Sequence, residues 1–274
     1  MKKLIRISLL VILAVLIFGC VNFFKMTDLR ANYPIVSGEQ AKAQQLMKEM
    51  GEAHNIHLWD SIQTYAVTYK DEFYDFMGNQ GNPFKESNMT FSMNYIPGEF
   101  DGQMTIESGK EKGTTWGIQD WKTYIWEEGK AVLKKDKNIQ FWIPTYQYFV
   151  ELPARIQETN VVEYVGSRDI NGTKVEGVLA SWNEVAPQKD IDQYILWIDA
   201  ETKRIVKVDY TVREAYKFIS GGAYFNHYKD YNGIILPSEL PVESNLVKDG
   251  LLHKMSIVDF KPDQVEVSEL RPLE

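Results

Sequence analysis

The histidines are the first residues of this chain to consider as metal ligands or catalytic groups. His54 and His57 form an H-x-x-H pair, and two histidines at this spacing on a helix can share a metal ion. A zinc site needs three or four protein ligands, however, and the other two histidines, His227 and His253, lie far along the chain. The pair is therefore interpreted as the polar end of a helix, and no metal site is predicted.

The acidic residues also fall short of a catalytic pattern. Glu184, Asp190 and Asp192 are close in sequence, but they lie in a polar stretch around Pro187 where solvated acids are expected. The chain has no G-x-S-x-G, no H-E-x-x-H and no glycine-rich phosphate loop. A nucleophilic triad can be assembled from residues distant in sequence, so a hydrolase stays the least favoured alternative. We therefore expect a non-catalytic protein without a cofactor.

Cys20 is the one cysteine, and it directly follows a short apolar run. Basic residues precede this run (7–18), which is too short for the roughly 20 residues that cross a bilayer, so residues 1–19 have the pattern of a signal peptide. The stretch Ile17-Phe18-Gly19-Cys20 resembles a bacterial lipobox. The resemblance implies that Cys20 becomes the lipid-modified first residue, carrying acyl chains such as palmitate. The alternatives are an ordinary signal peptide with an incidental cysteine and an uncleaved anchor helix.

A lipid on Cys20 would make the membrane the first partner of this protein. Two or more acyl chains anchor a protein stably without a basic patch. Residues 20–36 are interpreted as the tether. Because Val21 and Asn22 follow the cysteine, resemblance to Gram-negative sorting rules favours the outer membrane, facing the periplasm. In an envelope with a single membrane, the anchor would lie in its outer leaflet.

The amino-acid composition excludes further classes of protein. The net charge of −8 and the isoelectric point near 5.2 argue against nucleic-acid binding. A hydrophobic fraction of 44% excludes a disordered chain. With no cysteine besides Cys20, the mature protein must be stabilised by a core and not by disulfides.

The elements that must position any site are one helix followed by many strands. Ala43, Leu46, Met47 and Met50 recur at helical spacing, which predicts a helix over 39–53. Beyond it, apolar and polar residues alternate, and tight-turn signals such as Asn171-Gly172 separate the segments. The aromatic stretch 139–156, interrupted by two prolines, is interpreted as a short helix or a lid-like loop.

The apolar residues exceed what a single-sided sheet requires. Residues 194–198 have no polar position, so this strand needs a covering layer on both faces. Methionines and aromatic residues dominate the early strands, and methionine is frequent on surfaces that adapt to variable partners. They can equally fill a core. As the lining of an apolar cavity we predict Tyr65, Met89, Phe91, Met93, Met104, Trp116 and Trp126.

The order of these features resembles the LolA/LolB-like lipoprotein carriers of the periplasm. Residues 193–199 (QYILWID) with 202–208 (TKRIVKV) look like the late hairpin of that family, and residues 228–237 (YKDYNGIILP) look like the next one. The resemblance covers residues 38–262. It implies a curved antiparallel half-barrel whose helices close the open side over bound acyl chains. Soluble carriers of the family hold the lid with an arginine on an early strand, but here no arginine lies between Arg30 and Arg155.

The sequence therefore predicts a mainly β, α+β protein. One domain (37–274) is expected to form a half-barrel of roughly ten to twelve strands, with an early helix and a short helical lid on its concave side. The favoured function is a lipid-anchored cell-envelope protein that binds acyl chains or lipidated ligands in an apolar cavity. The alternative is a sensor or interaction module that presents an exposed apolar patch, for example at residues 141–149.

Overall fold

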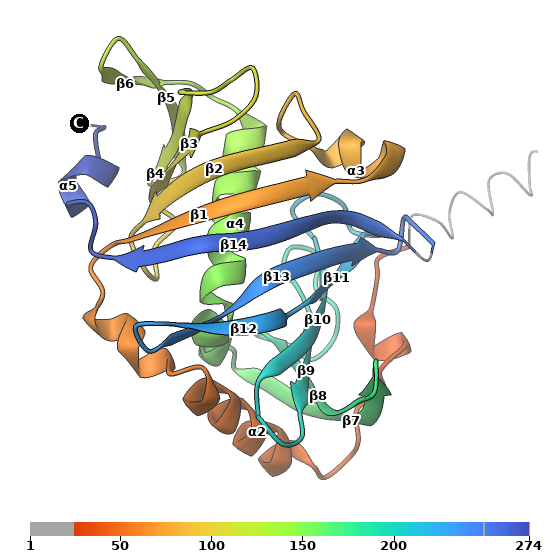
Figure 1. The fold of residues 1–274 in the computed structure, drawn as a ribbon. Helices are drawn as coiled ribbons and strands as arrows, with labels where there is room; N and C mark the ends of the chain where they lie inside the picture. Colours follow the sequence, from red (N-terminus) through yellow and green to blue (C-terminus); the bar gives the residue numbers. More distant parts are fainter. Residues whose placement is uncertain (1–24, 249, 274) are drawn as a thin grey trace, which may run out of the picture.

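The computed structural model describes residues 25–248 and 250–273 (Figure 1). The predicted signal peptide, Cys20 and its expected lipid lie outside the described residues. Within the described ranges, none of the helices combines the length and the hydropathy needed to cross a membrane.

One antiparallel sheet of 14 strands dominates the molecule. It curves around the long helix α4 without closing, and its spatial order runs β6-β5-β4-β3-β2-β1-β14-β13-β11-β10-β9-β8-β7, with β12 paired to β13 (Figure 1). The strands are β1 (Tyr65–Phe73), β2 (Asn88–Tyr95), β3 (Gly102–Ile106), β4 (Thr115–Gln119), β5 (Lys122–Glu127), β6 (Lys130–Leu133), β7 (Val161–Ile170), β8 (Thr173–Ser181), β9 (Tyr194–Asp199), β10 (Ile205–Thr211), β11 (Ser220–Tyr224), β12 (Asn226–Tyr231), β13 (Ile234–Ser244) and β14 (Leu251–Pro262).

The predicted curved antiparallel sheet is confirmed, but the expected count of ten to twelve strands is too low. Gly221 and Gly222 have the composition of a turn or bulge, yet they lie inside β11. A Cβ at Gly221 would come within 2.9 Å of the Tyr210 ring, and one at Gly222 would come within 2.8 Å of the Lys207 side chain. At Gly221 the Tyr210 ring and the backbone of Glu243 leave little room for a side chain, whereas the neighbours of Gly222 are flexible side-chain ends.

The helices are few. They are η1 (Leu29–Ala31), α2 (Gln40–Ala53), η2 (Ile56–Ser61), α3 (Asp75–Gly81), α4 (Lys137–Arg155), η3 (Ile156–Glu158) and α5 (Val267–Leu270). Helix α2 matches the predicted helix, and its apolar stripe is buried as expected. Helix α4 corresponds to the aromatic stretch 139–156 and is longer than the short helix or loop predicted from its two prolines.

Strand register determines which face of the sheet each residue occupies. Val67 pairs with Met93, Met93 with Met104, Met104 with Trp116, and Trp116 with Ile125. Directly paired residues point to the same side of a sheet, so this row lies on one face. We call this face, on which α4 lies, the concave face, and the opposite one the convex face.

The convex face has its own apolar cluster. Val175, Leu179, Ile195 and Trp197 are buried there, and Leu29 from the N-terminal segment is 3% exposed among them. Tyr33 packs edge-on against Trp197, with ring centroids 5.2 Å apart. The expectation that residues 194–198 are covered on both faces is therefore confirmed. The cover on the convex side comes from residues that the sequence had placed in the tether.

This packing makes the N-terminal segment part of the folded domain. We expect Leu29→Ala to lower the free energy of unfolding by about 2 kcal/mol, because it removes buried methyl groups and leaves a cavity. Val36 is 40% exposed, so Val36→Ala should change stability by about 0.5 kcal/mol or less. Urea denaturation of the two variants measures both values. Equal stability of Leu29→Ala and the parent chain would show that the segment does not belong to the core.

Candidate functional site

Helix α4 lies across the concave face and is the element on which the candidate site depends (Figure 1). Asp136 caps its first turn by accepting a hydrogen bond from the amide of Asn138 at 2.9 Å. Apolar residues then recur at helical spacing and face the sheet: Ile139, Trp142, Ile143, Tyr146 and Val150. Pro144 and Pro153 each remove one helical hydrogen bond, but burial of this stripe offsets their cost and the helix continues through both.

Five of the seven predicted lining residues lie together beneath this helix. Tyr65, Met89, Phe91, Met93 and Met104 are each at most 2% exposed. The Phe91 ring meets Tyr146 of α4 with centroids 4.9 Å apart. The side chains of α4 thus pack directly against this layer and cover it.

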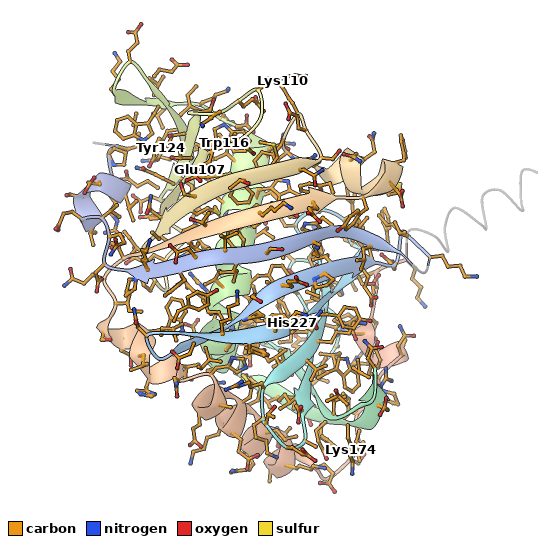
Figure 2. The ribbon with its side chains drawn as sticks, in the orientation of Figure 1. Glu107, Lys110, Trp116, Tyr124, Lys174 and His227 are labelled. Atoms are coloured by element: carbon orange, nitrogen blue, oxygen red, sulfur yellow. The ribbon has the colours of Figure 1, made fainter. Side chains whose placement is uncertain are left out.

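The two tryptophans predicted to line the cavity lie on opposite faces of the sheet. Trp116 is half-buried on the concave face and stacks on Phe84 with ring centroids 5.7 Å apart (Figure 2). Trp126 follows Ile125, which pairs with Trp116, so Trp126 lies on the convex face. Its assignment to the lining is corrected, because a change of one position along a strand reverses the face.

Three tyrosine hydroxyls of β1 and β2 connect the sheet to α4. Tyr95 donates to the carbonyl oxygen of Ile143 at 2.7 Å, and Tyr69 donates to the carbonyl oxygen of Tyr146 at 3.1 Å. Tyr65 donates to the Glu151 carboxylate at 2.8 Å. Burial raises the pKa of all three phenols well above the ordinary value, so they remain donors at any physiological pH. The chain thus holds its helix with strand tyrosines, and its early strands lack the arginine that soluble carriers of the resembling family use.

A buried acid forms a second connection. Asp71 of β1 is fully buried and accepts a hydrogen bond from the hydroxyl of Tyr146. His253 of β14 places its Nδ1 3.0 Å from the same carboxylate, and its ring stacks on Phe73. One carboxylate therefore links two strands and the helix.

Glu151 forms the third connection, near the C-terminal end of α4. It pairs with Arg155 at 2.7 Å and accepts the amide of Gly98 at 3.0 Å. Burial raises its pKa, while Arg155 and these hydrogen bonds oppose the increase. Gln147 donates to the carbonyl oxygens of Ile96 and Glu99, which joins the helix to the loop between β2 and β3.

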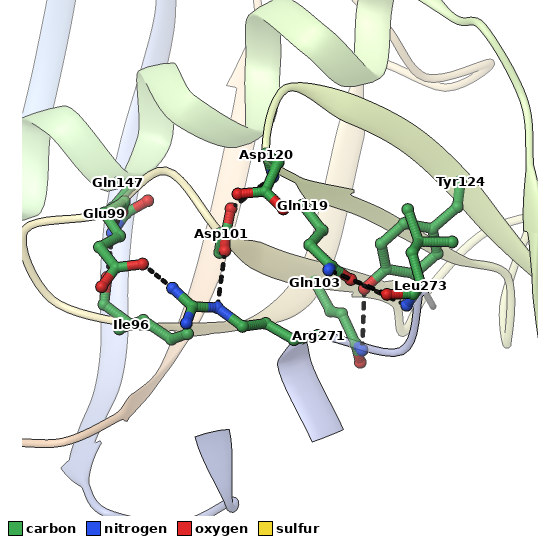
Figure 3. Close-up of polar contacts among 10 residues, drawn as sticks. All are labelled: Ile96, Glu99, Asp101, Gln103, Gln119, Asp120, Tyr124, Gln147, Arg271 and Leu273. Carbon is green, nitrogen blue, oxygen red and sulfur yellow. Dashed lines mark hydrogen bonds and ion pairs between the residues drawn. The ribbon is translucent and has the colours of Figure 1, made fainter. Parts of the chain in front are cut away.

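The C-terminal segment supports that loop from the other side. Arg271 bridges Glu99 and Asp101, with 2.9 Å between its Nε and Asp101 Oδ2 (Figure 3). The backbone of Leu273 exchanges hydrogen bonds with Gln119 of β4. The loop on which α4 rests is thus held between the helix and the end of the chain.

The residues that could have suggested catalysis have structural roles. His54 is buried and accepts the amide of Ile205 at Nε2 over 3.2 Å, whereas His57 is exposed. Asp192 is half-buried and accepts hydrogen bonds from the hydroxyl of Thr211 and from the amide of Arg213. Among the described residues, no group of three or more His, Cys, Asp or Glu side chains is placed to hold a metal ion.

A hollow of about 640 Å³ lies on the convex side and differs from the expected apolar cavity. Its wall includes Lys207, Asp209 and Glu243, and Lys207 pairs with Asp209 at 2.9 Å. This charged lining is unsuited to acyl chains. The alternative of an exposed aromatic patch at residues 141–149 is also not observed, because Trp142, Tyr146 and Phe149 are at most 9% exposed.

Comparisons with known proteins identify the fold. No family model matches the sequence, and no curated protein matches it. Among solved structures, a LolA superfamily protein from Nitrosomonas europaea is similar, with a TM-score of 0.54 and 10% identity over 83% of this chain and 96% of that one. A structure described as an outer membrane lipoprotein-sorting protein domain from Vibrio parahaemolyticus has a TM-score of 0.52 and 11% identity, over 84% of this chain and 97% of that one.

These similarities show that the chain has the fold of the LolA superfamily, as its sequence predicted. Sequence reasoning missed the polar groups that hold α4. A signal for one of them was present, because Asp71 shares the period-two face of Tyr65, Val67 and Tyr69. A carboxylate on an apolar face needs a partner inside the protein.

His54 predicts a specific pH dependence. Burial lowers its pKa from 6.5 to about 4, so the unfolded chain takes up a proton in this interval and the folded chain does not. Its contribution to the free energy of unfolding is therefore complete above about pH 6.5 and is lost as the pH falls towards about 4, by about 3 kcal/mol in total. The stability difference between the parent chain and His54→Gln should shrink over this range in urea denaturation. A constant difference between the parent chain and His54→Gln across this range would contradict the prediction.

Proposed function

We propose that this chain is a lipid-anchored protein of the cell envelope that binds acyl chains, or the lipidated part of a ligand, between α4 and the concave face. Binding involves no covalent chemistry. The observation that carries the proposal is the aromatic and methionine layer of β1 to β3, which is covered by one amphipathic helix. Long flexible chains suit such a surface because contact area, and not directional bonding, supplies their affinity.

The way in which α4 is attached supports its role as a movable cover. The tyrosine bonds to Ile143 and Tyr146 end on backbone carbonyl oxygens of the helix. When α4 moves away, the phenols are exposed to water or to a ligand and keep a partner. Each such bond contributes only about 0.5–1.5 kcal/mol in net terms, so the closed state is stabilised without being permanent.

The anchor completes the proposal. Cys20 carries the lipid after removal of residues 1–19. The domain then faces the periplasm from the outer membrane, or the outside from a single membrane. The fold neighbours are named for lipoprotein sorting and superfamily membership, which agrees with a non-catalytic role in the envelope.

The decisive experiment is to identify what co-purifies with the full chain expressed in a bacterium. Native mass spectrometry and organic extraction should give one lipid or acylated molecule per chain. Uptake of a fluorescent fatty acid by the delipidated protein provides a second measurement. A protein that yields no lipid and takes up no fatty acid would refute the proposal.

Weakening the cover should strengthen binding. Tyr69→Phe together with Tyr95→Phe removes two hydrogen bonds to α4 and leaves the apolar contacts in place. The open state becomes more populated, so apparent affinity for the fluorescent fatty acid should rise by about 10-fold. Tyr124→Phe is the matched control: this tyrosine is fully buried on the convex face and accepts from Gln103 (Figure 3). An equal affinity in both variants would show that α4 does not limit access.

A further inference from the structure

One end of the molecule exposes apolar side chains in segments that are distant in sequence. In α3, Phe76 is 73% exposed and Met77 is 37% exposed. In the loop between β10 and β11 (212–219), Tyr216 is 60% exposed and packs on Phe218. Leu246 and Val247 in the turn between β13 and β14 (245–250) are half-exposed. We call α3 and these two loops the rim.

Hydrogen bonds and close backbone contacts join the rim into one continuous surface. The amide of Tyr74, just before α3, donates to the carbonyl oxygen of Leu252 at 2.9 Å. Leu252 lies just beyond the β13–β14 turn, and a Cβ on Gly78 of α3 would meet its carbonyl oxygen at 2.2 Å. Within the turn, the Asn245 side chain donates to the carbonyl oxygen of Phe218 at 2.8 Å. The three segments therefore form one edge of the protein, on the right of Figure 1.

The chain leaves the domain from this same edge. The amide of Thr27 donates to the carbonyl oxygen of Lys217 at 2.9 Å, and its hydroxyl donates to that of Phe218 at 2.8 Å. Arg213 donates to the carbonyl oxygen of Thr27. Thr27 is thereby fixed to the rim loop that carries Tyr216.

Chain length then limits how far the rim can lie from a lipid anchor. Between Cys20 and Thr27, the chain spans at most about 25 Å even when fully extended, at 3.3–3.6 Å per residue. An anchored domain is consequently held with the rim as its nearest surface to the membrane. This step rests on the proposed lipidation of Cys20.

The charge of the rim suits a lipid surface. By sequence the rim carries three basic and three acidic residues, which balance, although the chain as a whole carries −8: Arg213, Lys217 and Lys248 against Asp75, Glu214 and Asp249. A strongly acidic surface would be repelled by anionic lipids, whereas this rim is not. Tyrosine beside lysine is also a typical combination at the membrane–water interface.

We propose that the rim docks on the membrane that holds the anchor, with Phe76, Met77 and Tyr216 in contact with the lipid interface. Docking turns the protein from a domain on a short tether into one with a fixed orientation. The end of the concave face next to α3, where Phe73 packs against Phe84 and Trp142, then lies beside the bilayer. Acyl chains would have their shortest path to the concave face at that end.

The test places a polarity-sensitive dye on the rim of the full chain. A lipidated Cys20 has no free thiol, so the cysteine introduced by Tyr216→Cys is the one labelled, and Phe76→Cys gives a second rim position. Leu133→Cys is the matched control, because Leu133 is 65% exposed at the end of β6, outside the rim. The labelled proteins are purified from membranes and reconstituted in phosphatidylcholine–phosphatidylglycerol vesicles, and flotation and quenching by brominated lipids are measured.

We expect both rim dyes to shift to shorter emission wavelengths and to be quenched several-fold more than the dye at position 133. Chains that float with the vesicles while all three dyes report water would overturn rim docking and leave the anchor intact. Chains that do not float would refute the anchor and the rim together. A rim dye already protected in detergent, in a concentration-dependent manner, would show that a second copy of the chain covers this edge, which also overturns the proposal.

Discussion

Everything in this structure depends on covering the apolar concave face of an open sheet. A closed barrel removes its edges and encloses its interior, but this sheet ends at β6 and β7 without joining them. The residues along β1 and β2 are apolar at every second position except Asp71, so an uncovered concave face would present a large hydrophobic surface to water. Helix α4 covers this face over the early strands, and α2 covers it over β7 and β8. The apolar stripe of α4 is stable as a helix because the sheet buries it.

The two faces of the sheet are covered in different ways, and the difference suits the proposed function. On the convex face, Leu29 and Tyr33 of the short N-terminal segment pack into a compact cluster around Trp197. On the concave face, a long helix contributes polar contacts at defined points as well as apolar area. Apolar contact favours any occupant of the face, whereas the phenols of Tyr69 and Tyr95 favour α4 in one position. Under the proposed function, a ligand with long apolar chains replaces the apolar contact area of the helix, and the polar contacts set how readily it does so.

In the proposed function, the N-terminal segment connects the concave face to the membrane. Because residues from Thr27 onward belong to the fold, the free chain ahead of the domain is shorter than the sequence suggested. A short connection limits the orientations of the domain, and the same edge exposes Phe76 and Tyr216. In this proposed arrangement the rim lies between the lipid anchor and the concave face, which holds the candidate site.

Local sequence determined much of this protein. Spacing alone identified α2, the alternating strands and the Asn171-Gly172 turn, since positive φ angles at these two residues satisfy a tight turn between neighbouring strands. Spacing also placed five of the predicted lining residues on one face of β1 to β3, because period two groups them without knowledge of the fold, and all five are buried there.

Other features were decided by tertiary structure. Asp71 and His253 are 182 positions apart and meet because β1 pairs with β14, which no local pattern encodes. Helix α4 continues through Pro144 and Pro153 because burial against the sheet outweighs two lost hydrogen bonds, a balance that exists only once the sheet has formed. Trp126 lies on the convex face because the register of β5 against β4 sets which alternate residues point inward. Local propensity acts over a few residues, whereas partner, face and register depend on contacts between distant parts of the chain.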